Sequence, residues 1–245
     1  MVQQLDEVPP NQMFHAKYPY RASGSALIRK HGENVAERII QACANGQNSF
    51  VVEIGSNDGV MLKTLSEAGI RHLGVDPAVV AADVAQAHGV NVWKEFFDAA
   101  TATKIRDEYG LANLIYSANT ISHISYLDSI FLGADILLAS DGLFVFEDRY
   151  LGDIVNCIYF DQIYDEHIYL FGALGAGDGD SVRLRANRCR TPSFARGLHP
   201  LHGCPCGYLQ ASRLNSGIFG TREGLGACRG SDLHRVLRRR RPHPD

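Results

Sequence analysis

Residues 50–59, Phe-Val-Val-Glu-Ile-Gly-Ser-Asn-Asp-Gly, decide the fold that this chain is expected to adopt. An apolar run ends on an acid and enters a turn punctuated by glycines, and residues 60–65 follow with helical spacing of apolar side chains. This pattern predicts a strand, a tight turn and a helix. A second strand at 72–76 closes on Asp76. Two strand ends, one with glycines and one with a carboxylate, indicate a site for a nucleoside-like cofactor.

Beyond this stretch, apolar strands keep alternating with helices. We expect helices near 59–68, 78–88, 98–109 and 126–138, and further strands at 90–93, 114–119 and 143–147. Strands separated by helices of ten to fifteen residues favour a parallel sheet covered on both faces. Because crossovers between parallel strands are right-handed, the predicted fold is α/β and doubly wound.

Three regions are predicted along the chain. Residues 1–45 are expected to form an arm and a helix over the active site, and residues 46–171 a Rossmann-like domain that binds the cofactor. Residues 1–20 are polar, contain prolines and end in Tyr-Pro-Tyr, so we expect extended chain rather than helix there. A helix is expected over 23–44.

The third region, residues 172–245, has a different character. It contains thirteen arginines and no lysine, and it shows no sustained period of 2 or 3.6. One interpretation is a disordered basic tail. We favour a segment read out of frame, since a GC-rich gene in a wrong frame yields such a mixture of Arg, Gly, Ala, Pro and Cys. Cys204 and Cys206, with His199 and His202, resemble the ligands of a metal site. Only one of the two cysteine pairs that such a site usually has is present, so we expect no metal.

Composition narrows the class of protein. At 245 residues with 45% apolar content, the chain can build one full domain, and its net charge of −3 does not suggest a nucleic-acid partner. No run of eighteen apolar residues occurs, and residues 1–14 lack the apolar core of a signal peptide. The unevenly placed cysteines fit a disulfide framework badly. We therefore expect a cytoplasmic enzyme without a membrane partner, and the oligomeric state stays open.

The spacing Glu-x-Gly-x-Asn-x-Gly in residues 53–59 differs from the dinucleotide pattern Gly-x-Gly-x-x-Gly. It resembles motif I of class I methyltransferases, which use S-adenosylmethionine. The resemblance implies that cofactor, with Asp76 accepting both ribose hydroxyls. The residues expected to bind it are Glu53, Gly55, Asn57, Asp58, Gly59, Asp76, Phe96 and Asn119.

Alternatives remain at several of these positions. A nicotinamide enzyme or a purely structural turn would also explain the glycines. Asp76 would serve equally as a strand-end or helix cap before Pro77. By the same resemblance Phe96 or Phe97 lies against the adenine, although either could be a core aromatic. Asn119 ends the fourth strand, at the edge where ligands of such sheets bind.

A second dense stretch, residues 160–169, contains Tyr164-Asp165-Glu166-His167. These polar and ionisable side chains are unsuited to a hydrophobic core. Because their segment follows the fifth strand closely, we expect the chain to return there toward the cofactor site at the carboxyl ends of the strands. His123 lies just past the fourth strand. Taken with Tyr18-Pro19-Tyr20 and the cofactor turn, they resemble the sugar C-methyltransferases of deoxysugar pathways, over roughly residues 2–171.

This resemblance implies methylation at C3 of a dTDP-4-keto-6-deoxyhexose, a nucleotide-sugar substrate, in deoxysugar and antibiotic biosynthesis. His167 is the expected base, because imidazole has a pKa near neutrality, and Tyr164 is the alternative. Glu166 and His123 would orient groups or stabilise the C4 enolate, and Tyr18 would close over the reacting centre.

Members of that family begin with a zinc module and end with a second αβ domain, and we expect this chain to lack both. We therefore keep two further hypotheses. The first is an O- or N-methyltransferase of another small metabolite that uses the same cofactor. The second is an inactive fragment that binds the cofactor. Loss of a packed domain would also expose apolar surface.

Overall fold

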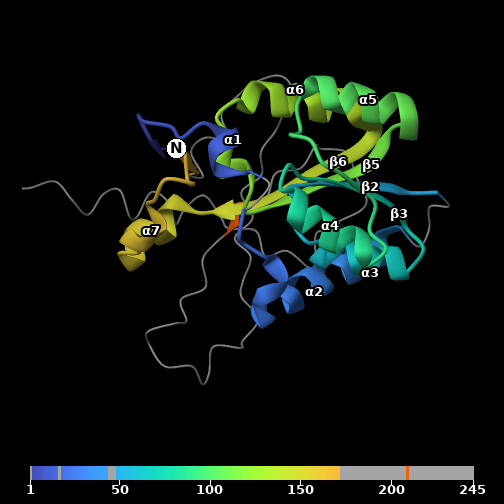
Figure 1. Ribbon diagram of the computed structural model, residues 1–245, viewed down its shortest axis with the longest axis horizontal. Helices are drawn as coiled ribbons and strands as arrows, with labels where there is room; N and C mark the ends of the chain where they lie inside the picture. Colours follow the sequence, from blue (N-terminus) through green and yellow to red (C-terminus); the bar gives the residue numbers. More distant parts are fainter. Residues whose placement is uncertain (1, 16–17, 44–47, 172–207, 210–245) are drawn as a thin grey trace, which may run out of the picture. The chain divides into compact units, whose positions relative to one another are not determined.

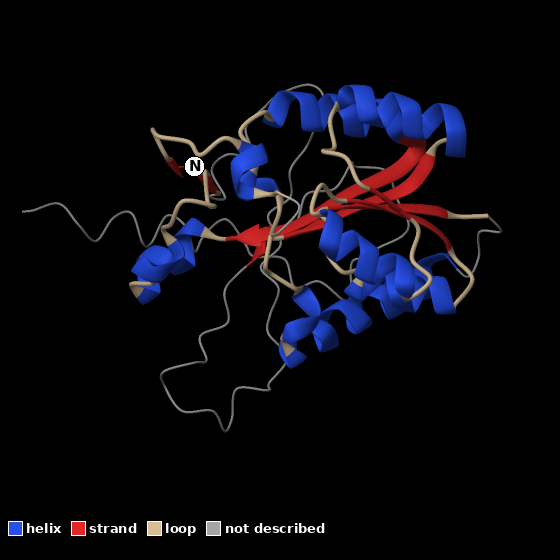
Figure 2. Cartoon of the chain, viewed as in Figure 1, coloured by secondary structure: helices blue, strands red, loops and turns tan. Residues whose placement is uncertain are grey.

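The computed structural model of the protein describes residues 2–15, 18–43 and 48–171, together with the backbone of 208–209. Within these residues, a sheet of six strands carries helices on both faces (Figures 1 and 2). The predicted α/β, doubly wound class is confirmed. The expectation of an out-of-frame segment and the Cys204–Cys206 pattern lie outside the described residues.

The sheet has the strand order β4-β3-β2-β5-β6-β8. Its first five members run parallel, and β8 pairs antiparallel with the end of β6. Their bounds are β2 Phe50–Ile54, β3 Arg71–Val75, β4 Val92–Trp93, β5 Ala112–Ala118, β6 Leu138–Arg149 and β8 Tyr208–Leu209. The order reverses between β2 and β5, and ligands of open α/β sheets bind at the carboxyl ends of strands at such a switch point.

Two helical layers cover the sheet. Figure 1 shows α5 and α6 on one face and α2, α3 and α4 on the other. The bounds are α2 Ala26–Cys43, α3 Val60–Glu67, α4 Val79–Ala87, α5 Ala99–Tyr109 and α6 Leu127–Leu137. Because both faces are covered, all five residues of β2 are buried, as the near-continuous apolar run predicted.

Short elements at the carboxyl edge complete the described chain. They are β1 Val2–Gln3, α1 Pro10–Met13, the 3-10 turn η1 Ala22–Gly24, η2 Ile121–His123, α7 Leu151–Cys157, η3 Phe160–Gln162 and β7 Tyr169–Leu170. The expectation of fully extended chain over residues 1–20 is wrong at α1. Pro10 occupies its first turn, where the fixed φ of proline favours a helix and the missing N–H costs nothing.

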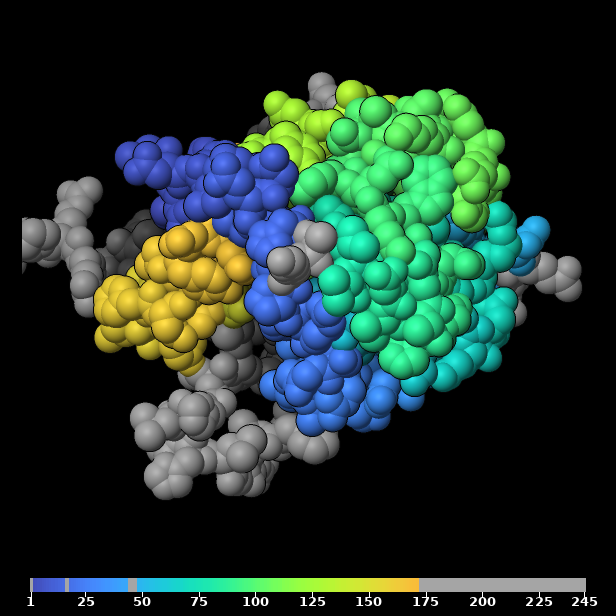
Figure 3. Space-filling view, in the orientation of Figure 1, coloured from blue at the N-terminus to red at the C-terminus, as the bar shows by residue number. Residues whose placement is uncertain are grey.

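The arm of residues 2–24 is attached to the segment that follows β6. β1 pairs antiparallel with β7, and the side-chain amide of Gln4 donates to the carbonyl of Tyr164 at 2.7 Å. In Figure 3 the arm, in dark blue, lies beside the gold segment that contains α7 and η3. These contacts hold the start of the described chain against the segment that follows β6.

Candidate active site

The turn after β2 has the backbone that its glycines were expected to supply. Gly55 and Gly59 have φ of 72° and 77°, and Asn57 lies in the same left-handed region at 47°. A Cβ on Gly55 would lie 2.2 Å from Oγ1 of Thr120, which belongs to the loop after β5. Gly55 is therefore required by a close approach within the protein as well as by its own backbone conformation.

Asp76 follows β3 directly and stabilises this turn through hydrogen bonds of its carboxylate. Its Oδ2 accepts the N–H of Asn57 at 2.7 Å, and its Oδ1 accepts the N–H of Ala78 at 2.8 Å. Burial raises the pKa of Asp76, and these two hydrogen bonds oppose the rise. Each carboxylate oxygen has two lone pairs, so Asp76 can cap the turn and still accept a ligand hydroxyl. Both roles considered from the sequence are compatible with this geometry.

Glu53 lies in the last part of β2, and one of its carboxyl oxygens lacks a hydrogen-bond partner among the described residues. Its carboxyl group is buried, and no described residue hydrogen-bonds its Oε2. Burial raises the pKa of Glu53 well above its usual range, and the charges of Asp76 and Asp58 raise it further. A buried polar atom without a partner calls for an explanation, and three converging carboxyl groups suit a ligand with cationic groups.

The arm reaches this turn through η1. The carboxylate of Asp58 accepts from the hydroxyl of Ser23 at 2.5 Å and from its N–H at 3.2 Å. Asn57 accepts the N–H of Ala22 at 3.0 Å and donates to the carbonyl of Tyr20 at 3.3 Å. The side chains of Asn57 and Asp58 thus hold the arm against the turn.

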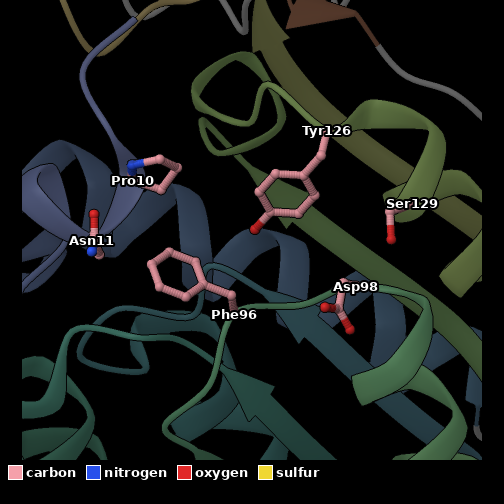
Figure 4. A pocket seen from close by; sticks show the side chains of 6 residues that line it. All are labelled: Pro10, Asn11, Phe96, Asp98, Tyr126 and Ser129. Atoms are coloured by element: carbon pink, nitrogen blue, oxygen red, sulfur yellow. The ribbon is translucent and has the colours of Figure 1, made fainter.

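A pocket of about 430 Å³ opens beside α1 (Figure 4). Phe96, which follows β4, and Tyr126, which precedes α6, both line it, and the other lining residues are Pro10, Asn11, Asp98 and Ser129. Phe97, the alternative adenine contact, is 3% exposed and belongs to the core. Of the two aromatics, only Phe96 is in position to meet a ligand in this pocket.

Asn119 also lies at the carboxyl edge, directly after β5. Its φ is 50°, in the left-handed region that Asn tolerates better than most residues. Its N–H donates to the carbonyl of Glu147, at the end of β6, at 2.8 Å. Asn119 therefore lies at the carboxyl edge of the sheet, directly after β5 and beside the last part of β6.

The five predicted catalytic side chains are brought together by three segments. The hydroxyl of Tyr18 donates to Oε2 of Glu166 at 3.2 Å. The ring of His167 lies 4.2 Å from that of Tyr164 and 5.1 Å from that of His123, between ring centroids. Because Tyr20 in the same arm touches the cofactor turn, this cluster adjoins the turn.

The two histidines of the cluster differ in their partners. His167 is 2% exposed, with Nδ1 2.6 Å from the carbonyl of Gln162 and Nε2 3.1 Å from Nε of Arg149. Burial and the charge of Arg149 lower the pKa of His167, while the carbonyl opposes them. No described residue hydrogen-bonds Nε2 of His123, and burial, with His167 and Arg149, lowers its pKa to about 3.

Comparison with known proteins shows what kind of domain this is. Residues 28–174 match the model of a family described as a methyltransferase domain. The chain belongs to this methyltransferase family. C-methyltransferase NovU of Streptomyces niveus is 34% identical over 164 residues, which make up 67% of this chain and 39% of NovU.

A solved S-adenosylmethionine-dependent methyltransferase of Archaeoglobus fulgidus shares the fold. Its TM-score is 0.53 at 16% identity, with 76% of this chain and 94% of that chain covered. The predictions of a methyltransferase and of S-adenosylmethionine as its cofactor are confirmed. The chain therefore spans about two fifths of the length of NovU.

The residues around the turn fit this cofactor. Glu53 offers an unpaired carboxyl oxygen to a cationic ligand, Asp76 offers lone pairs to hydroxyl groups, and Phe96 offers an aromatic face. Among the described residues, no cluster of His, Cys, Asp or Glu could hold a metal ion, and no helix is long and apolar enough to cross a membrane.

Arg149 belongs to the candidate site, and the sequence analysis did not single it out. It ends β6, and its contact with His167 spans 18 residues. One signal was available, because Arg149 ends the fifth parallel strand at the edge where ligands of such sheets bind.

Proposed function

We propose that this chain is the methyltransferase domain of a C-methyltransferase that acts at C3 of a dTDP-4-keto-6-deoxyhexose, in deoxysugar or antibiotic biosynthesis. The observation that carries the proposal is the meeting of Tyr18, His123, Tyr164, Glu166 and His167 beside the cofactor turn. The similarity to a C-methyltransferase, NovU, supports the same class of reaction.

His167 is the base in this proposal. The C3 proton is acidified by the neighbouring C4 ketone and moves to Nε2 of His167, while its electron pair passes into the enolate and places the charge on the C4 oxygen. Bound S-adenosylmethionine supplies an electrophilic methyl group, to which C3 forms the new C–C bond as the S–C bond breaks. Nδ1 must carry a hydrogen, because the carbonyl of Gln162 only accepts, so Nε2 is the nitrogen that can take the proton.

The other members of the cluster suit supporting roles. Burial, followed by Glu166, raises the pKa of Tyr18, so its hydroxyl stays protonated and acts as a donor. Burial raises the pKa of Tyr164 and the guanidinium of Arg149 opposes the rise, which makes Tyr164 a weaker candidate for the base than an imidazole. His123 stays neutral at physiological pH and can orient the acceptor.

The test follows the proton and the methyl group separately. The protein is incubated in D₂O with dTDP-4-keto-6-deoxyglucose, and exchange at C3 is followed by NMR. Addition of S-adenosylmethionine labelled with ¹³C in its methyl group should then give a signal coupled to a sugar carbon. His167→Ala should slow the exchange by about 100-fold or more, and His88→Ala, an exposed histidine at the end of α4, should not change it.

Other results would point to the other two hypotheses. A methyl group found on oxygen or nitrogen would make the chain an O- or N-methyltransferase of another metabolite. Calorimetric binding of S-adenosylmethionine without any binding of dTDP would indicate a cofactor-binding fragment. Undiminished C3 exchange in His167→Ala would remove His167 from the role of base.

A further inference from the structure

Arg149 occupies the only basic lone pair of His167. Its Nε–H donates to Nε2 of His167 at 3.1 Å. On the other side of the ring, Nδ1 lies 2.6 Å from the carbonyl of Gln162 and must carry the hydrogen. The imidazole is thereby fixed in one neutral tautomer, and its basic nitrogen faces a permanent cation.

This arrangement cannot accept a proton as it stands. A proton on Nε2 would point at the N–H of Arg149 across the same 3.1 Å and would place two positive charges in contact. Arginine does not release a proton in proteins, so the conflict cannot be relieved by titration of Arg149. If His167 is the base, Arg149 must leave Nε2 when the acceptor reacts.

The guanidinium of Arg149 is not held by a salt bridge within the described part of the chain. Among the residues that the structure describes, no Asp or Glu side chain forms a salt bridge with Arg149. The adjacent Asp148 is already engaged, since its two oxygens accept the N–H of Ser122 at 2.7 Å and the backbone N–H of Arg149 at 2.9 Å. The guanidinium of this half-buried arginine also interacts with the side chain of Tyr164 and with the charge of Asp148, but it forms no salt bridge with a described carboxylate, so it can turn to an anionic ligand atom.

We propose that Arg149 is a further catalytic residue, which leaves Nε2 of His167 to bind the oxygen that becomes negatively charged on the acceptor. This inference rests on the proposed function. The oxygen is attached to the carbon next to the one that loses its proton, so a group that touches the base in the free protein lies close to that oxygen in the complex. One movement of the guanidinium then frees the base and supplies a donor to the enolate.

The proton and charge balance is complete. The acceptor carbon loses its proton to Nε2 of His167, and the electron pair of the C–H bond becomes the enolate. The guanidinium, already positive, pairs with the enolate oxygen rather than facing the new imidazolium. The other titratable groups that face His167 are Tyr164 from the preceding loop and His123 from η2.

The variants Arg149→Gln and Arg149→Lys test the two halves of the proposal. In the free protein, the pKa of His167 is measured by long-range ¹H–¹⁵N NMR, with the signal assigned by comparison with His167→Asn. It should rise in Arg149→Gln, because the facing cation is gone. This readout needs no substrate and no turnover, and an unchanged pKa in Arg149→Gln would overturn the proposal whatever the activity.

Whether Arg149 stabilises the enolate is tested by the rate of C3 hydrogen exchange of dTDP-4-keto-6-deoxyglucose in D₂O. Arg149→Gln should slow exchange by about 100-fold although its base is stronger, because the enolate loses a charged donor, and Arg149→Lys should recover part of the rate. The control is Arg106→Gln, which removes a partly exposed arginine from α5. Exchange in Arg149→Gln equal to or faster than that of the unmodified protein would show that Arg149 only blocks the base. Absence of exchange in the unmodified protein would instead count against the proposed function.

Discussion

Glu53, Asp58 and Asp76 place three carboxyl groups around one turn, and they differ in how fully their oxygens are hydrogen-bonded by the described residues. Asp58 is bonded to Ser23 and Asp76 to the turn itself, whereas Oε2 of Glu53 has no partner among the described residues. The energetic cost of this arrangement is lowest when Glu53 is protonated, or when a positive charge is bound beside it. The residue should therefore couple cofactor binding to pH.

We predict that S-adenosylmethionine binds more tightly as the pH rises, with release of a proton. In the free protein the pKa of Glu53 is raised, chiefly by burial, so the group is protonated at low pH and must ionise to meet a cationic ligand. Glu53→Gln should weaken binding by roughly tenfold, a free energy of about one pKa unit, and remove the pH dependence. Calorimetry in two buffers of different ionisation enthalpy measures the proton directly. Equal proton release from Glu53→Gln would assign the effect to another group.

Secondary structure elements with a strong pattern were predictable, and short ones were not. The parallel strands and the helices between them followed from apolar runs and helical spacing, because both faces of the sheet are covered. The four residues of α1 and the seven of α7 carry too little periodicity to be read. Likewise, β6 begins at Leu138, directly after α6, earlier than the apolar run at 143–147 suggests.

The candidate site shows the same division. Glycines and acids at strand ends were visible because their spacing in the chain is short. The contact between Arg149 and His167 depends on how the chain returns after β6, which no local pattern encodes. Resemblance to a family identified the cluster, and the fold was needed to show that Nε2 of the expected base is already occupied.

An ion pair between His31 and Glu147 links helix α2 to β6, and its contribution to the free energy of unfolding should depend on pH. Nε2 of His31 lies 2.6 Å from Oε2 of Glu147, and this hydrogen bond raises the pKa of His31, against the effect of burial. The stabilisation is therefore fully present below the unfolded pKa of about 6.5 and is lost as the pH rises through the folded pKa.

We expect His31→Ala to lower the free energy of unfolding by about 0.5 kcal/mol more at pH 5.5 than at pH 8.5, a modest value because the pair is partly exposed. Urea denaturation at the two pH values measures the difference. Glu147→Gln should give the same pH-dependent loss, and the double variant should show no further pH dependence. A cost that is equal at both pH values would mean that the pair is not ionic.

The end of α7 has an unusual residue in its cap. Ile158 has φ of 58° and ψ of 42°, a left-handed conformation that is strained for a β-branched side chain, and its side chain is largely exposed. Ile158→Gly should raise the free energy of unfolding by about 1 kcal/mol, since it relieves the strain and loses little packing. Chemical denaturation measures this, and Ile158→Ala, which keeps a Cβ in the same conformation, should give a smaller gain. A loss of stability in Ile158→Gly would show that the contacts of the side chain outweigh its strain.

The described part of the molecule buries its sheet but exposes several large apolar side chains around α7 and η3. Val155, Ile158, Phe160 and Ile163 lie within nine residues of one another, and each is between 52% and 73% exposed. They belong to α7, η3 and the loops beside them, next to the cluster that contains Tyr164 and His167. Soluble domains seldom leave several large apolar side chains exposed so close together without a functional reason.

This surface should dominate the self-association of the protein and its binding of hydrophobic dyes. The double variant Val155→Ser and Phe160→Ser is expected to reduce the fluorescence of a bound naphthalene sulfonate dye and the concentration dependence of sedimentation. Cofactor affinity should stay unchanged, because neither side chain lines the cofactor turn or the pocket beside α1. Leu27→Ser, which removes an apolar side chain of 80% exposure from α2, is the matched control. An equal reduction in that control would mean that exposed apolar area in general, rather than the edge around α7, drives association.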